Sequence, residues 1–185
     1  MTGSRAIVVM TGVAALWLTC LFSAFRYFGG HPMTAELRHT TTITLALAMR
    51  ALQAALEEAQ RASVRVSIVI VDAAGQPIHM AHMDGAPAPC RAIASNKALT
   101  AAGFGLSTGA WAERLQRSSE MVRQGLPLQN GLVLFGGGEP FLLDGAVIGA
   151  VGVSGASETQ DAACAEAAVR CVADVVEAIR GCAVP

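Results

Sequence analysis

The strongest constraint on the fold is the run of residues 64–71, which reads Val-Arg-Val-Ser-Ile-Val-Ile-Val. It begins with alternating apolar and polar residues and ends as an unbroken apolar stretch. A strand that faces solvent on one side alternates throughout, whereas a strand covered on both sides is continuously apolar. The run therefore predicts a strand in the middle of a sheet that is buried on both faces.

A hairpin is expected directly after this strand. Residues 72–75, Asp-Ala-Ala-Gly, are typical of a turn in which Gly75 can take a positive φ angle. Pro77 opens a second strand that continues through His82, and proline is tolerated at the start of a strand. The two segments are therefore predicted to pair as a β-hairpin.

Three more strands are expected in the second half of the chain. A tight glycine loop at residues 136–140 precedes the second of them, and Asp144-Gly145 forms a two-residue hairpin turn before the third. The expected segments are residues 131–135, 141–143 and 146–153.

Apolar residues spaced three and four apart predict helices at both ends of the chain. The first helix follows the capping hydroxyls of residues 40–42. The last has a capping box formed by Ser157 and Gln160 and is expected to end at Gly181. The predicted inner faces are Leu45, Met49, Leu52 and Leu56 in the first helix, and Ala165, Val169, Val172, Val176 and Ile179 in the last.

Two further helices are expected in the middle of the chain, at residues 91–104 and 108–117. Consecutive strands followed by helices are typical of an α+β domain with an antiparallel sheet. The sequence therefore predicts a five-stranded antiparallel sheet with helices on both faces.

Composition excludes several classes of protein. Apolar residues make up 53% of the chain, which is too many for a disordered protein. The 13 basic and 14 acidic residues give a net charge of −1, so no general attraction to nucleic acid is expected. Aromatic residues make up only 5%, which also argues against stacking on single-stranded nucleic acid.

The first 32 residues differ from the rest, which we treat as one domain at residues 33–185. Residues 6–25 carry no charge and are long enough to span a bilayer as a helix. Three interpretations stay open: a membrane anchor, a signal peptide, and translation that starts at Met33. An anchor predicts a membrane-bound protein with the membrane as partner, a signal peptide predicts an exported one, and a start at Met33 predicts a cytoplasmic one.

The cysteines do not predict a metal site or a disulfide. Cys164 and Cys171 are seven residues apart on one helix, about 10 Å along its axis, which is too far for a disulfide. The chain has no C-x-x-C motif. Free thiols buried as small apolar groups are therefore expected, and no metal ligands are predicted.

Histidines on the second strand form the first candidate site. His79 and His82 are three residues apart and should point to opposite faces, so each would act alone, as an axial ligand or a proton carrier. Met80 and Met83 beside them add polarisable surface suited to a flat apolar cofactor. The alternative is that one histidine is simply exposed and the other satisfied within the sheet.

The only lysine, Lys97, marks a second candidate site. It can bind a carboxylate or polarise a carbonyl group, with Glu139 or Asp161 as the acid or base of an enzyme. Glu139 is the better base, because it follows three glycines and has no obvious ion-pair partner. The residues expected to line this pocket are Thr108, Gly137, Gly138 and Gly155.

Several motifs together resemble the GlcG/HbpS family, which is also found as the C-terminal domain of PduO-type proteins. They lie between about Thr40 and Ile179 in the order and spacing of that family. The matching segments are V-I-V-D-A-A-G at 69–75, M-D-G-A at 83–86, S-N-K-A-L-T-A-A-G-F at 95–104, S-T at 107–108, G-G-G-E-P at 136–140 and G-A-V-G-V-S-G at 149–155.

The resemblance implies a profilin-like fold of three α/β/α layers, a homo-oligomer, and in some members haem binding. One position departs from the family, which often has histidine where this chain has Gln76. The favoured hypothesis is thus a non-catalytic protein that binds haem or another tetrapyrrole, with a small-molecule enzyme at the Lys97 site as alternative. A third is an oligomeric accessory protein without a site. The cofactor-binding residues of the first hypothesis are His79, His82, Met83 and Thr108.

Overall fold

The computed structural model describes residues 39–182. The chain divides into two units, Met1–His39 and Thr40–Pro185, and the second contains all of the helices and strands described here. The expectations for residues 1–32 and the boundary after them lie outside the described residues. Within the described range, no helix has both the length and the apolar character needed to cross a membrane.

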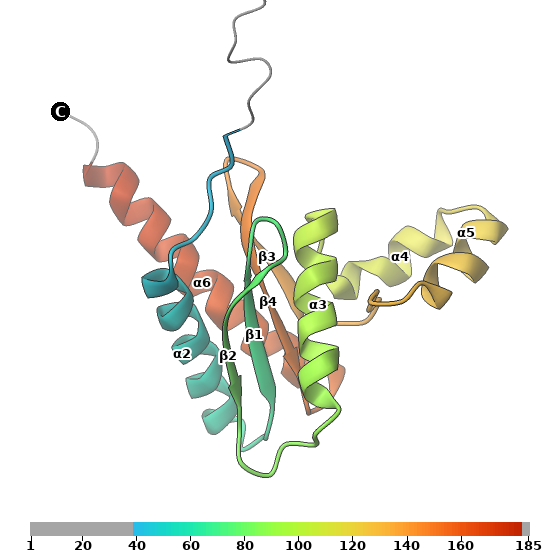
Figure 1. Ribbon diagram of the computed structural model, residues 1–185, viewed down its shortest axis with the longest axis horizontal. Coiled ribbons are helices and arrows are strands. Elements are labelled where there is room, and N and C mark those ends of the chain that lie inside the picture. Colours follow the sequence, from blue (N-terminus) through green and yellow to red (C-terminus); the bar gives the residue numbers. More distant parts are fainter. Residues whose placement is uncertain (1–38, 183–185) are drawn as a thin grey trace, which may run out of the picture. The chain divides into compact units, whose positions relative to one another are not determined.

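The described chain is a mixed α+β domain (Figure 1). Its elements in chain order are α2 (Leu45–Arg61), β1 (Ser67–Asp72), β2 (Pro77–His82), α3 (Cys90–Phe104), η2 (Thr108–Ala110), α4 (Trp111–Gln116), α5 (Glu120–Gly125), η3 (Leu126–Leu128), β3 (Gly138–Leu143), β4 (Ala146–Ser154) and α6 (Glu158–Cys182).

The sheet has the strand order β2-β1-β4-β3, and every neighbouring pair is antiparallel. The prediction of a buried central strand is confirmed, because every residue of β1 except Asp72 is buried. The predicted hairpin of β1 and β2 is also confirmed, with Gly75 at a φ of 80° in its turn. Asp144 and Gly145 both have positive φ angles, 51° and 79°, in the turn between β3 and β4.

The prediction of five strands is wrong, because the described residues contain four. Residues 131–135 form no strand, since the amide of Val133 donates to the hydroxyl of Thr100 on α3 instead of to a neighbouring strand. Strand β3 begins within the predicted glycine loop, at Gly138, which pairs with Gly152. The predicted helix at 108–117 is found as η2 and α4, whereas α5 and η3 were not predicted.

Helices cover both faces of the sheet (Figure 1). Helix α3 packs on one face, which we call the α3 face, and α2 and α6 pack on the other, the α2/α6 face. Along β1, the side chain of Val69 joins the core under α3, whereas Ile68 and Ile70 join the core under α2 and α6. This alternation explains why the β1 segment is apolar at consecutive positions.

Most of the side chains that α2 and α6 bury in their shared core are small. The predicted inner face of α2 is wrong at two positions, because Leu45 is 55% exposed and Met49 52% exposed. Alanines turn inward in their place, since the two helices pack directly against each other and larger side chains would hold them apart. We call the following residues the alanine seam: Ala48, Ala51, Ala55 and Ala59 of α2 with Cys164, Ala165 and Ala168 of α6.

The predicted capping box at the start of α6 is confirmed. The Ser157 hydroxyl accepts from the Gln160 amide, and Gln160 Oε1 accepts from the Ser157 amide, both at 3.3 Å. The predicted end at Gly181 is wrong, because α6 continues to Cys182. Ile179 is 63% exposed rather than on the inner face, since the last turns of α6 extend beyond the sheet (Figure 1).

Candidate functional site

Lys97 is buried between α3, the end of β4 and the start of α6. The side chain has no exposed surface, and its Nζ donates to the Val153 carbonyl and to Asp161 Oδ2, both at 2.8 Å. The ring of Phe135 lies over the same ammonium, with its centroid 4.8 Å from Nζ. Lys97 is therefore part of a desolvated ion pair and not an open cation on a pocket wall.

Asp161 uses both carboxylate oxygens within the protein. Oδ2 accepts from Lys97, and Oδ1 accepts from the Ala156 amide at 3.0 Å, just before the first turn of α6. Its side chain is 4% exposed. The pair thus joins α3 to the start of α6, a structural role that uses the atoms an acid or base would need.

The glycines of the predicted pocket allow close packing around this pair. A Cβ atom on Gly137 would lie 2.8 Å from Lys97 Nζ, and one on Gly138 would lie 2.6 Å from Thr108 Cγ2. Thr108 itself accepts from the Gly138 amide at 2.8 Å. Gly155 is packed against a different segment, since its Cβ would lie 2.4 Å from the Arg65 carbonyl. The absence of a side chain at Gly137 and Gly138 and the hydrogen bond to Thr108 therefore let the loop, β3 and η2 pack closely together.

Glu139 has a hydrogen-bond partner but no ion-pair partner among the described residues. The Ser107 hydroxyl donates to Glu139 Oε1 at 2.5 Å. Burial raises the pKa of this carboxyl group, and the hydrogen bond from Ser107 opposes that rise only in part. Glu139 is the candidate acid or base whose carboxyl group remains half-buried and free of an ion pair in the described part of the chain.

Replacement of Glu139 by Gln is expected to reduce the loss of stability as pH rises. Because its pKa is raised by folding, the native state holds the proton more tightly than the unfolded state. Stability is therefore lost between the ordinary pKa of a glutamate and the raised one. Urea denaturation over a pH series measures the effect, with the exposed Glu113→Gln as control. An unchanged pH dependence in Glu139→Gln would contradict the assignment.

The two strand histidines lie on opposite faces, as predicted from their spacing. In the β1–β2 register, His79 is opposite Ile70 on the α2/α6 face, and His82 is opposite Ser67 on the α3 face. His82 Nδ1 lies 2.7 Å from the Ser67 hydroxyl. Thr108 is not near either histidine, because it contacts β3, at the opposite edge of the sheet from β2.

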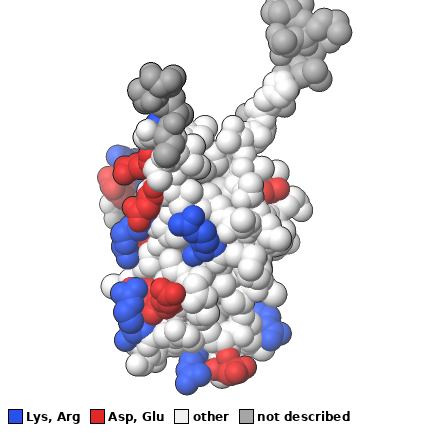
Figure 2. Space-filling view, turned by 90° about the vertical axis from the view of Figure 1, so that its left-hand side faces the viewer, with Lys and Arg blue, Asp and Glu red and all other residues white. Residues whose placement is uncertain are grey.

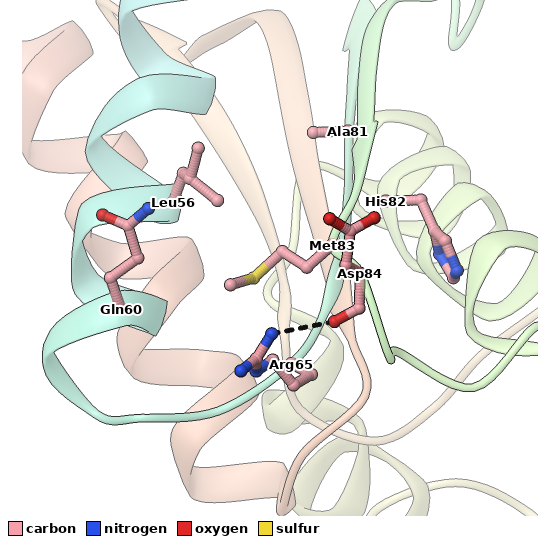
Figure 3. Close-up of a pocket in the computed structure, with 7 residues that line it drawn as sticks. All are labelled: Leu56, Gln60, Arg65, Ala81, His82, Met83 and Asp84. Atoms are coloured by element: carbon pink, nitrogen blue, oxygen red, sulfur yellow. Dashed lines mark hydrogen bonds between the residues drawn. The ribbon is translucent and has the colours of Figure 1, made fainter.

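A cavity of about 310 Å³ lies between the end of α2 and the end of β2 (Figure 3). Met83 extends into it toward Leu56, whereas the imidazole of His82 points away from it (Figure 3). Arg65 lies at its lower rim and donates to the Asp84 carbonyl at 2.9 Å. The side chains of Met83 and His82 therefore point to different sides of β2, although the residues are adjacent in sequence.

Sequence reasoning missed three residues of these sites: Ser67, Phe135 and Ser107. Ser67 had a signal, because it is the one hydroxyl within the apolar run of β1. Ser107 belonged to the S-T motif at 107–108, but nothing in the sequence paired it with Glu139. Phe135 had no signal, because Lys97 is distant from it in sequence.

Cys164 carries a buried free thiol. Burial raises the pKa of Cys164 to about 11, so the thiol is protonated at neutral pH.

On the face shown in Figure 2, basic and acidic side chains lie next to one another beside a wide uncharged area. Pairs such as Arg61 with Glu58 and Arg170 with Glu166 cancel locally.

The fold and these sites define a small α+β domain built around a buried ion pair, with a histidine held on an edge strand. The chain belongs to the HbpS-like family. The family model, described as "Haem degrading protein HbpS-like", matches residues 43–170. This match confirms the resemblance found in the sequence motifs.

Similar proteins agree with this assignment. An uncharacterised 15.0 kDa protein from the dhaT-dhaS intergenic region of Citrobacter freundii is 38% identical over 134 residues, 72% of this chain and 94% of that protein. The Klebsiella pneumoniae protein ORFY is 32% identical with a TM-score of 0.68, covering 74% of this chain and 94% of that one. The haem complex of PduOC is 30% identical with a TM-score of 0.65, covering 71% and 95%.

Proposed function

We propose that this chain binds haem or a related tetrapyrrole at the edge strand β2, as a binding protein without catalysis. Two findings support the proposal: the family is described as haem degrading, and a similar solved structure is a haem complex. The observation that carries it is the contact between His82 and Ser67. Haem supplies a redox-active iron when it is bound.

The residues present fit a haem ligand at His82. A histidine that binds a metal through one ring nitrogen usually donates a hydrogen bond through the other, which fixes the tautomer and the ring. Ser67 is completely buried, and its hydroxyl lies 2.7 Å from Nδ1. In the tautomer whose Nδ1 donates to this hydroxyl, Nε2 is the nitrogen left to bind iron. Met80, on the same face of β2 and 50% exposed, adds an apolar surface beside the ring.

The other predicted ligands take lesser parts in this proposal. His79 faces α2 and α6, so it cannot bind the same iron from the same side as His82. Met83 lines the 310 Å³ cavity on that opposite side. Gln76, at the position where the family often has histidine, lies in the β1–β2 turn at the far end of β2 from His82. His82 therefore acts at a different place and does not replace that residue.

Haemin titration of the full chain tests the proposal. We expect a saturable Soret band in the wild type and its loss or shift in His82→Ala, with no change in His79→Ala as matched control on the same strand. Ser67→Ala should weaken binding about 10- to 100-fold, because the ring loses its fixed orientation. An identical Soret band in wild type and His82→Ala would rule out His82 as ligand.

The alternative of an enzyme at Lys97 is less well supported, because Asp161 and Lys97 are paired with each other. We also propose that the domain has a profilin-like three-layer fold and that it forms a homo-oligomer. Native mass spectrometry of the titrated protein would measure its oligomeric state.

A further inference from the structure

The ammonium group of Lys97 has one N–H without an oxygen acceptor among the described residues. A lysine ammonium has three N–H donors. Two of them go to Val153 and Asp161, and the ring of Phe135 lies over the group at 4.8 Å. Phe135 is itself 47% exposed, although the lysine beneath it has no exposed surface. A half-exposed aromatic ring therefore lies over a fully buried cation.

The two residues that follow Phe135 are held by backbone hydrogen bonds to neighbouring elements. The Gly136 amide donates to Glu158 Oε1 at 2.6 Å, and the Gly137 carbonyl accepts from the Val153 amide at 2.7 Å. Rotamer changes of exposed side chains are fast and leave the fold intact. Outward rotation of the ring would expose the third N–H and leave a space of aromatic size next to it.

The charges around this space select the kind of ligand. Asp161 already neutralises Lys97, and the carboxylate of Glu158 lies directly beside Gly136. A further negative charge would be repelled by these two groups, whereas a neutral acceptor with a small apolar body would not. We propose that Phe135 is a removable cover over Lys97, and that the uncovered ammonium donates to the carbonyl oxygen of a small neutral aldehyde or ketone. This site is independent of the haem proposal.

The test uses the fact that Lys97 is the only lysine in the chain. Protein labelled with ¹⁵N-lysine gives a single Nζ signal, which reports directly on this group. Acetone and acetate serve as probes, because they are similar in size and differ in charge. We expect a saturable shift of the Nζ signal with acetone and none with acetate.

Phe135→Ala should bind acetone at least 5-fold more tightly, because no side chain has to be displaced. Leu142→Ala is the control, because it removes a half-exposed apolar side chain on β3 instead of the ring of Phe135. This variant should bind acetone as the wild type does. If Phe135→Ala does not fold, Phe135→Leu keeps an apolar cover without an aromatic face and should still bind more tightly than the wild type. The proposal is overturned if acetone shifts no signal, if acetate shifts it equally, or if the affinity is the same with and without the ring.

Discussion

Lys97→Met should lower the free energy of unfolding by about 3–5 kcal/mol, since it leaves a buried carboxylate without its partner. Asp161 is 4% exposed, and its Oδ2 atom accepts a hydrogen bond from Lys97 at 2.8 Å. Removal of the cation therefore destabilises the folded state, because a desolvated carboxylate remains without a compensating charge. Urea denaturation followed by circular dichroism measures the difference.

Two further variants make this prediction specific. Lys97→Met combined with Asp161→Asn should recover at least half of the loss, because the amide keeps an acceptor for the Ala156 amide without a charge. Arg170→Met removes the cation of a pair whose side chains are 63% and 61% exposed, and should cost less than about 1 kcal/mol. A Lys97→Met protein as stable as the Arg170→Met protein would show that the buried pair contributes nothing.

Gly152→Ala is expected to be at least as damaging. A Cβ atom at this position would lie 2.0 Å from the Ala94 carbonyl oxygen and 2.6 Å from the Ala98 amide nitrogen. Both atoms belong to the backbone of α3, so no side chain can rotate to make room. The helix must shift away from β4, which we expect to cost about 3 kcal/mol or more, or to prevent folding.

The control is Gly103→Ala in α3, the helix that Gly152 packs against, where an added Cβ would meet no atom within 4 Å. Alanine is favoured over glycine in a helix by up to about 1 kcal/mol, so this variant should be as stable as the wild type or slightly more stable. Thermal unfolding of the two variants side by side checks the pair of expectations. Equal melting temperatures for the two variants would contradict the close packing of α3 on β4.

The elements with local signals were predictable from the sequence. The β1–β2 hairpin, the turn at Asp144 and the capping box of Ser157 each depend on residues within a few positions of one another. The position of His82 on the opposite face from His79 also follows from the two-residue period of a strand.

The parts that depend on distant partners were not predictable. Residues 131–135 resemble a strand, yet Thr100 on α3 takes the hydrogen bond of Val133 that a strand would use. The sequence places Lys97 and Asp161, 64 positions apart, in one candidate site, but it does not show that they pair with each other. Hydrophobic spacing favoured Leu45 and Met49 for the inner face of α2, because leucine and methionine bury more apolar area than alanine. Packing between two helices reversed that preference.

The alanine seam has a consequence for how stability is distributed in this domain. Alanine has no side-chain rotamers to lose on burial, so the α2–α6 contact forms with little loss of conformational entropy from its side chains. Each methyl group also contributes little apolar area, so a truncation to glycine at one of these positions removes little buried surface. An enlargement is different, because Ala48, Ala51 and Ala55 are each fully enclosed. The seam therefore discriminates by size: it tolerates loss of volume better than gain, the reverse of a core built from large side chains.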